Sequence, residues 1–270
     1  MKAVAQLLFA VILAAGVAGC ETVQTTQAGT VGVDRKQSML VSSAEVNQAA
    51  EQEYQKVIGQ ARQQGKLNQN AQQVQRVRTV AQRLIPQTRA FRSDAPGWKW
   101  EVNVITDSQL NAWCMPGGKI AVYTGLVEKL NLTDAELAAI MGHEIAHALR
   151  EHGREQVSRQ TATGLAVGVA SAALGLGDAG SQLASMVADV TFNLPHSRTD
   201  EVEADRIGVE LAARAGYEPH AAVSVWQKML QSSSGGPPQF LSTHPAPENR
   251  LSDLKVYADR VMPLYQAAKH

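Results

Sequence analysis

Two histidines and one glutamate that could bind a metal ion and activate water lie close together in the pattern His-Glu-x-x-His, at His143, Glu144 and His147. Residues four apart on an α-helix lie about 40° from each other around the axis, so both imidazoles can reach one ion if this stretch is helical. Glu144 would lie beside them and take a proton from a metal-bound water. The pattern is typical of zinc-dependent peptide hydrolysis, and the alternative is a solvated helix face.

A catalytic zinc ion also needs a third protein ligand, and the stretch EVEAD at residues 201–205 offers candidates. Glu201 and Asp205 are four apart and share one face of a helix predicted from about Arg198 to Ala215. We expect Glu201 to bind the metal and Asp205 to accept a hydrogen bond from the far ring nitrogen of a ligand histidine. Glu203 points elsewhere in this geometry and is the weaker candidate.

The first motif requires a helix, and the residues before it predict one. Thr133 is a suitable N-cap and Glu136 completes a capping box with it, so a long helix begins here and contains the motif. Upstream, apolar residues recur at spacings of three and four from residue 43 to about residue 89, with a break near Gly65 and an end at Pro86. These segments predict two amphipathic helices.

Two strand-like runs lie between those helices and the metal-binding motif. Trp98–Ile105 and Lys119–Thr124 are rich in β-branched and aromatic residues, and a loop that ends in Pro116-Gly117-Gly118 separates them.

The small apolar residues of Thr161–Gly180 are interpreted as a packed helical element near the site, with membrane-surface contact as the alternative. A terminal helix is expected over Leu251–Ala268. The predicted fold class is α+β, mostly helical, with a small mixed sheet whose edge strand borders the cleft.

The first twenty residues resemble a bacterial lipoprotein signal. Lys2 is followed by an apolar run from Val4 to Val17 and by small residues that end in Cys20. We expect export, cleavage before Cys20 and lipidation of its thiol, and an ordinary secretory signal is the alternative. Lipoproteins in which aspartate does not follow the cysteine usually go to the outer membrane, and here Glu21 follows it. The predicted organisation is a signal peptide over residues 1–19, a lipidated tether over 20–40 and a zinc metallopeptidase domain over 41–270.

The composition favours a globular domain and points to no charged partner. The chain has 270 residues, 44% of them hydrophobic, with 25 basic and 25 acidic residues. This balance provides no basic surface for nucleic acid, so no nucleic-acid partner is expected. Cys114 would be the only thiol left after lipidation of Cys20. It has no histidine near it in sequence, so we expect it to be buried rather than catalytic.

Further short motifs complete a pattern that a known family shares. They are Asn111-Ala112, Pro116-Gly117-Gly118, Tyr123-Thr124-Gly125, and Thr243-His244-Pro245 with Arg250. Together with the two metal-binding motifs, they make the chain resemble, from about Ser43 onward, the gluzincin metallopeptidases that include the CAAX prenyl proteases, HtpX, BepA and LoiP. The lipoprotein signal, without a multi-span membrane body or a tetratricopeptide domain, makes the resemblance nearest to LoiP-like periplasmic lipoprotein peptidases.

The resemblance implies a complete zinc site and a substrate site. The metal, one zinc ion, would be bound by His143, His147 and Glu201, with catalysis by Glu144. A substrate strand would add to an edge strand at Lys119–Thr124. The implied substrate-binding residues are Asn111, Ala112, Ile120 and Val122.

Four further residues are assigned partly from the resemblance. His244 would lie over the site, where it would either donate a hydrogen bond to the oxyanion or bind zinc in a closed resting form. Arg250 would steady that loop or neutralise the intermediate. His196 stands where the family has Tyr or Phe, and we favour a place on the surface or beneath the loop over one in the cleft. His152 is five residues after His147, so it would be turned away and form a structural hydrogen bond at the helix end.

Three functions fit these observations. The first is a zinc endopeptidase that degrades misfolded or stalled envelope proteins in outer-membrane protein quality control. The second is a chaperone-like assembly factor for outer-membrane proteins with little proteolysis, and the third is a structural zinc protein. The third is disfavoured because a structural site needs no base such as Glu144. Expected partners are unfolded or extended polypeptides, the membrane through the lipid anchor, and outer-membrane protein assembly machinery. The enzyme would lie in the periplasm, anchored to the outer membrane.

Overall fold

The computed structural model describes residues 21–168, 179–232, 239–245 and 248–269. The predicted signal peptide, the predicted lipidation site at Cys20 and the stretch 169–178 of the apolar segment lie outside these residues. Among the described helices, none is both long and apolar enough to cross a membrane.

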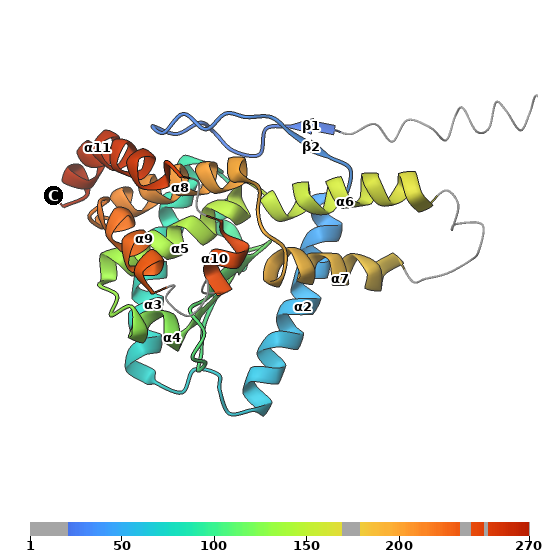
Figure 1. The fold of residues 1–270 in the computed structure, drawn as a ribbon, viewed down its shortest axis with the longest axis horizontal. Helices are drawn as coiled ribbons and strands as arrows, with labels where there is room; N and C mark the ends of the chain where they lie inside the picture. The colour runs from blue at the N-terminus through green and yellow to red at the C-terminus, as the bar shows by residue number, and fades with distance from the viewer. Residues whose placement is uncertain (1–20, 169–178, 233–238, 246–247, 270) are drawn as a thin grey trace, which may run out of the picture.

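The described chain is mostly helical with a small mixed sheet, which confirms the predicted fold class. The α-helices are α2 (Ser43–Gln63), α3 (Ala71–Leu84), α4 (Thr124–Lys129), α5 (Asp134–Leu149), α6 (His152–Gly168), α7 (Ala179–Phe192), α8 (Arg198–Arg214), α9 (Ala221–Gln231), α10 (Gln239–Thr243) and α11 (Arg250–Ala268). Two short 3-10 helices, η1 (Ile85–Ala90) and η2 (Ala95–Gly97), follow α3. Figure 1 shows α5 in the middle, with α8, α9 and α11 to one side and α2, α6 and α7 to the other.

The helix boundaries agree with the local signals in the sequence. Gly65 adopts a φ of 64° between α2 and α3, and Pro86 lies in the 3-10 turn that ends α3. Thr133 and Glu136 form the predicted capping box at the start of α5. Helix α8 ends just before Gly216, whose φ is 74°. Helix α9 was not predicted from the sequence.

The mixed sheet contains β3 (Glu101–Ile105), β4 (Ala112–Met115) and β5 (Lys119–Tyr123) in the order β3-β5-β4. Strand β5 is parallel to β3 and antiparallel to β4. The prediction that Lys119–Thr124 forms the edge strand is therefore wrong, because β5 is the central strand. The edge strand beside the cleft is β4, which lies in the segment predicted to be a loop.

The reason for this difference is the short turn between β4 and β5. Gly117 and Gly118 adopt φ values of 81° and 85°, and the Gly118 amide donates to the Met115 carbonyl at 3.2 Å. So tight a turn makes the residues before it pair with those after it as a hairpin. All four residues of β4 are buried, so the strand lacks the apolar–polar alternation by which a half-buried strand is recognised.

Helices α5 and α8 cross in close contact because each has a glycine at the crossing. A Cβ on Gly142 would lie 2.8 Å from the carbonyl oxygen of Gly208, and a Cβ on Gly208 would lie 2.7 Å from the backbone nitrogen of His143. These distances are too short for any larger residue. The two glycines therefore bring the helix of the first motif against the helix of the second.

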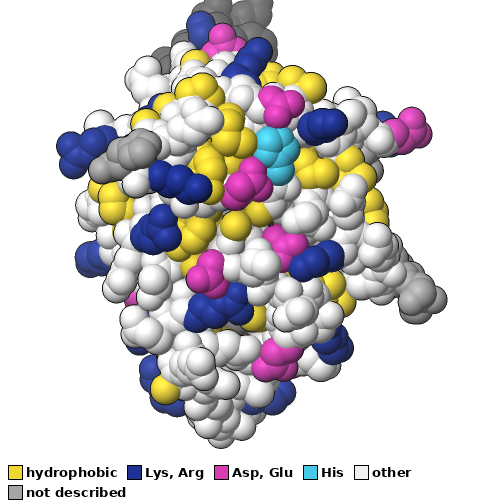
Figure 2. Space-filling model, turned by 90° about the vertical axis from the view of Figure 1, so that its left-hand side faces the viewer, with side chains coloured by type: hydrophobic (Ala, Val, Ile, Leu, Met, Phe, Trp, Pro, Cys, Tyr) yellow, Lys and Arg dark blue, Asp and Glu magenta, His cyan; other side chains and the backbone are white. Residues whose placement is uncertain are grey.

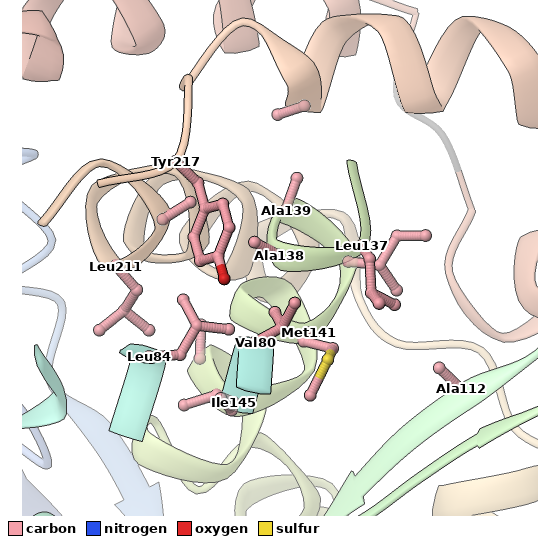
Figure 3. Packing of buried hydrophobic residues seen from close by; sticks show 14 of the residues in the cluster. Val80, Leu84, Ala112, Leu137, Ala138, Ala139, Met141, Ile145, Leu211 and Tyr217 are labelled. Carbon is pink, nitrogen blue, oxygen red and sulfur yellow. The ribbon is translucent and has the colours of Figure 1, made fainter. Parts of the chain in front are cut away.

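The hydrophobic core surrounds α5. Figure 3 shows side chains from α3, α5 and the end of α8 that meet in it, among them Leu84, Met141, Ile145 and Leu211. Every residue of α5 from Glu136 to Leu149 is buried. A helix that is enclosed on all sides holds its polar side chains in fixed positions, which a metal or catalytic site requires.

Residues 21–39, which we call the N-terminal strap, pack against the domain, although the sequence predicted a tether there. Strands β1 (Glu21–Val23) and β2 (Gln37–Met39) pair in antiparallel fashion, and the strap runs along α6 and α8 (Figure 1). Val31 and Val33 are buried. Their burial provides the apolar contacts that a free tether would lack, and nothing in their spacing signals it.

Charged side chains of both signs are mixed over the surface at the α11 end of the molecule. Figure 2 shows Lys and Arg next to Asp and Glu on this face, with small hydrophobic areas between them. One such group joins α9 to α11, where His220 lies 2.8 Å from both Glu218 and Asp259. This face carries no single sign of charge.

Candidate active site

The predicted metal-binding and catalytic residues meet in one buried cluster. Helix α5 contributes His143, Glu144 and His147, helix α8 contributes Glu201 and Asp205, and the segment from the end of α10 to the start of α11 contributes His244 and Arg250. All seven residues are buried. The ligand atoms of His143, His147, Glu201 and His244 lie within 4.8 Å of one another.

The three predicted metal ligands are spaced for a single ion. The Nε2 atoms of His143 and His147 are 3.0 Å apart, and the carboxylate oxygens of Glu201 lie 3.5 Å from the first and 3.4 Å from the second. Tetrahedral zinc with bonds of about 2.0–2.1 Å places its ligand atoms roughly 3.3–3.4 Å apart. The observed separations, measured from each histidine to a different oxygen of Glu201, are close to these values, and we call the three residues the ligand triangle.

Glu201 has the environment of a metal-binding carboxylate. Neither of its oxygens accepts a hydrogen bond from the described residues, although the side chain is fully buried and an Arg250 nitrogen lies 3.1 Å away. Burial raises the pKa of Glu201 to about 8. A buried carboxyl of this kind needs a further cation in order to be ionised at neutral pH, and a bound metal ion would provide it.

His143 is oriented by a carboxylate on its outer side. Its Nδ1 lies 3.0 Å from Oδ1 of Asp205, and this oxygen also accepts a hydrogen bond from Arg250 at 2.7 Å. A carboxylate held by arginine accepts from the ring, so His143 donates from Nδ1 and keeps a lone pair on Nε2. That lone pair faces His147 and Glu201, which is the arrangement expected from the sequence.

His147 has a corresponding partner that the sequence analysis missed. Its Nδ1 lies 2.9 Å from Nδ1 of His152, and Nε2 of His152 lies 3.0 Å from Glu203. The helical angle between His147 and His152 did not apply, because α5 ends at Leu149 and Glu151 turns the chain with a φ of 52°. His152 thus does form a hydrogen bond at the helix end, but with a predicted metal ligand.

Glu203 lies outside the ligand triangle, as expected, but in a cluster of positive groups. Burial alone would raise its pKa, yet hydrogen bonds from His152 and Arg35 lower it to about 2. Arg150 also donates to it at 2.9 Å. A carboxylate with several donors is ionised and acts only as an acceptor.

Glu144 lies beside the ligand triangle with a perturbed acidity. Burial, and then the charge of Glu201, raise the pKa of Glu144 well above its ordinary value, while a hydrogen bond with the backbone of Cys114 opposes the rise. The Nε2 atom of His244 lies 3.3 Å from Oε1 of Glu144. Cys114 itself is a free, buried thiol whose pKa is raised by burial, as expected for a residue that is not a nucleophile.

His244 and His196 form one wall of the site. The rings of His244 and His147 are 5.1 Å apart with an angle of 12° between their planes, and the ring of His196 lies 4.2 Å from that of His147. The amide of His196 donates to the carbonyl of Thr243, which ties it to the His244 segment. His196 therefore lies in the cleft, contrary to the position we favoured from the sequence.

The space between this wall and β4 is small. A cavity of about 40 Å³ is lined by Ala112 and Cys114 of β4, by Glu144 and His147, and by His244. A cavity of about 360 Å³ adjoins it and shares Pro116, Ala148 and Glu151 with it. A larger cavity of about 630 Å³ lies apart from these, between the N-terminal strap and α8.

The structure separates the four predicted substrate-binding residues into two groups. Ala112 is the first residue of the edge strand and lines the cleft cavity, and Asn111 directly precedes it. Ile120 and Val122 are in the central strand β5 and are buried in the hydrophobic core, so they cannot pair with an added strand. The prediction for Ile120 and Val122 is wrong for the same reason as the prediction of the edge strand.

A mostly helical domain with a buried histidine–glutamate cluster beside the edge of a small mixed sheet is the arrangement of a zincin-type metallopeptidase. A family model described as Peptidase family M48 matches residues 71–258. The chain belongs to this family, and the resemblance noted from its motifs is confirmed.

Curated proteins that this chain resembles include metalloendopeptidases. It is 35% identical over 159 residues to mitochondrial metalloendopeptidase OMA1 of Schizosaccharomyces pombe, which covers 58% of this chain and 46% of that protein. It is 35% identical over 185 residues to the OMA1 of Homo sapiens, with 63% and 34% covered. It is 29% identical over 170 residues to the beta-barrel assembly-enhancing protease of Escherichia coli, with 60% and 35% covered. The chain thus spans between a third and a half of the length of these relatives.

Proposed function

We propose that this chain is a zinc-dependent endopeptidase that hydrolyses peptide bonds of misfolded or stalled envelope proteins. The observation that carries the proposal is the spacing of the ligand atoms of His143, His147 and Glu201. The two Nε2 atoms are 3.0 Å apart, and one oxygen of Glu201 lies 3.4 Å from that of His147 and the other 3.5 Å from that of His143. The buried oxygens of Glu201, which accept no hydrogen bond from the described residues, support it. So does membership of a peptidase family.

Glu144 is the general base and acid of the proposed reaction. When bound, zinc polarises the scissile carbonyl and makes a water molecule more acidic. Glu144 takes the proton from this water and then passes it to the leaving amine. The carboxyl group must be ionised before the first step, and the charge of a bound zinc ion beside it would favour the ionised form against the rise in pKa that burial and Glu201 cause. We expect no covalent intermediate.

His244 and Arg250 have different roles in this proposal. His244 lies beside Glu144 and the ligand triangle. From this position it either stabilises the oxyanion or binds zinc in a resting form. Arg250 contacts Glu201 and Asp205 and packs over the ring of Trp226 at 3.2 Å. These contacts favour a role in which Arg250 steadies the ligand set.

The edge strand β4 provides the proposed binding surface for substrate. An edge strand can pair with an extended polypeptide through main-chain groups, which gives tolerance to sequence. Asn111 and Ala112 lie at one end of this strand, and the cavity next to Pro116 lies at the other. Unfolded or extended polypeptides are therefore the proposed substrates.

The proposed location is the periplasmic face of the outer membrane, with Cys20 as the lipidated residue. It is supported by the apolar run and the small residues that precede Cys20 in the sequence. Interaction with outer-membrane protein assembly machinery is supported by the similarity to the beta-barrel assembly-enhancing protease. A chaperone-like role with little proteolysis is the second candidate, favoured by the small volume of the cavity under His244.

The test compares zinc content and proteolysis in wild-type protein, in Glu144→Gln and in His143→Ala. We expect one zinc ion per chain in the wild type and in Glu144→Gln, and loss of zinc in His143→Ala. Cleavage of unfolded casein should fall by several orders of magnitude in Glu144→Gln, because the proton acceptor is lost. Glu128→Gln is the matched control, since it makes the same change at an exposed residue of α4.

Two results would contradict the proposal in different ways. Zinc retained in His143→Ala would show that the metal site is elsewhere. A zinc-loaded wild type that does not cut casein, together with full cellular function of Glu144→Gln, would favour the chaperone-like role.

A further inference from the structure

A line of hydrogen-bonded side chains leads from His147 away from the cleft to the N-terminal strap. Nδ1 of His147 lies 2.9 Å from Nδ1 of His152, and Nε2 of His152 lies 3.0 Å from Oε2 of Glu203. The other oxygen of Glu203 accepts from Nε of Arg35 at 2.6 Å. His152 is fully buried, so no solvent replaces these contacts.

The carboxylate of Glu203 determines which group donates and which accepts in each of these hydrogen bonds. Glu203 accepts from Arg35 and from Arg150, so it also accepts from Nε2 of His152. When the His152 ring is neutral, its single N–H is the one that faces Glu203, and Nδ1 of His152 therefore accepts from Nδ1 of His147. This leaves His147 with a lone pair on Nε2, which faces His143 and Glu201.

Two imidazole nitrogens with lone pairs that face each other at 3.0 Å repel unless a cation lies near both. The contact with Asp205 fixes the tautomer of His143 that has its lone pair on Nε2, and the contact with His152 fixes the same tautomer of His147. The hydrogen bonds on the outer sides of both rings therefore prepare them to bind a metal ion.

Arg35 connects the strap to several carboxylates at once. It forms two hydrogen bonds with Glu155, at 2.8 and 3.0 Å, and one with Asp200 at 3.2 Å, in addition to those with Glu203. Its own carbonyl accepts from Arg150 at 2.9 Å. Without this guanidinium, three buried carboxylates would lose a shared partner, and Glu203 would be free to turn away from His152.

We propose that His152, Glu203 and Arg35 are positioning residues for the metal ligand His147, so that the N-terminal strap is part of the metal site. The proposal rests on the zinc site proposed above. His152 sets the tautomer and the orientation of the His147 ring, Glu203 sets those of His152, and Arg35 holds Glu203. Partners of this kind typically contribute about 10- to 100-fold in metal affinity.

The test measures zinc affinity of the purified protein by competition with a chelator of known affinity. His152→Ala, Glu203→Gln and Arg35→Ala should each bind zinc about 10- to 100-fold more weakly than wild type. The absorption spectrum of the cobalt-loaded protein should also change, because it reports the geometry of the ligands. Arg76→Ala and His220→Ala are the controls, since these residues form comparable ion pairs far from the cluster. Both controls should bind zinc as the wild type does.

A pair of variants separates positioning from simple support of the fold. In His152→Asn the side-chain oxygen lies near the position of Nδ1 and can still accept from His147, whereas in His152→Gln the polar group lies nearer to Glu203. Zinc affinity should be closer to wild type in His152→Asn than in His152→Gln. Equal zinc affinities of His152→Asn and His152→Gln would overturn the role of His152. This comparison still tests the role if His152→Ala does not fold.

The outcomes distinguish this proposal from the proposed function. If the wild type binds no zinc, the proposed function fails. If the wild type binds zinc and His147→Ala loses it, but His152→Ala and Glu203→Gln bind as tightly as wild type, only the positioning role is wrong. Wild-type affinity in Arg35→Ala would remove the strap from the metal site.

Discussion

Glu203 illustrates, at the scale of single residues, how a buried charge depends on its neighbours. Burial opposes its ionisation, but His152, Arg35 and Arg150 all donate to its oxygens. The result is a carboxylate with a pKa of about 2 in the folded protein. The unfolded chain cannot reproduce this arrangement, so folding and ionisation of Glu203 stabilise each other.

We therefore expect the metal-free protein to lose stability as the pH falls from 4.5 to about 2. The folded pKa of Glu203 is lower than the unfolded one, so its contribution is fully present above pH 4.5 and is lost as the pH falls through the folded pKa. Urea unfolding of wild type and Glu203→Gln, measured across this range, should give free energies that converge at low pH. A constant difference between the two proteins would contradict this assignment, and Glu128→Gln controls for the loss of one carboxylate.

At the scale of elements, the crossing of α5 and α8 decides whether the two metal-binding motifs meet. The glycine pair Gly142 and Gly208 allows backbone contact between these helices. His143 follows one of these glycines directly, and Glu201 lies two turns before the other. A change in the separation of the helices therefore changes the distance between the ligands.

Gly208→Ala should weaken both folding and metal binding. Its Cβ would lie 2.7 Å from the backbone nitrogen of His143, so the helices must move apart. We expect a loss of about 1–3 kcal/mol in the free energy of unfolding, as for other overpacked cores, and weaker zinc binding. Gly59→Ala in α2 is the matched control, since a Cβ there meets nothing within 4 Å and should be neutral or stabilise the helix by up to about 1 kcal/mol. Equal zinc affinity in Gly208→Ala and wild type would argue against this coupling.

Elements with local signals were predictable from the sequence, and those set by distant contacts were not. The capping box of Thr133 and Glu136 marks the start of α5, and helical spacing places Glu201 and Asp205 on one face. The pairing of β4 depends on a hairpin that buries all of its residues, so no alternation reveals it. The contact between His147 and His152 depends on a reversal of the chain at Glu151. Helical angles apply only within one helix, so they could not predict this contact.

At the scale of the whole molecule, a bound metal ion would join α5 to α8 in the centre of the domain. An ion that binds the folded but not the unfolded chain raises stability by mass action, by about 4 kcal/mol at a free concentration of 1,000 Kd. The contribution would be absent from the unfolded state because the ligands come from two helices that are far apart in sequence.

Removal of zinc with a chelator should therefore lower the melting temperature of the wild-type protein. The same treatment should leave the melting temperature of His143→Ala unchanged, because this variant has already lost the metal. Differential scanning calorimetry with and without added zinc measures both effects. An equal response to the chelator in both proteins would indicate that the ion acts at another place.

The pairing of β1 with β2 begins at Glu21, the residue that follows the proposed lipid attachment site. If Cys20 carries a lipid, almost no slack chain separates the bilayer from the folded body. The domain would then stay at a short and nearly constant distance from the membrane, and it would not move freely through the surrounding space. Its substrates would be limited to polypeptides that come close to the lipid surface, even if the cleft accepts many sequences.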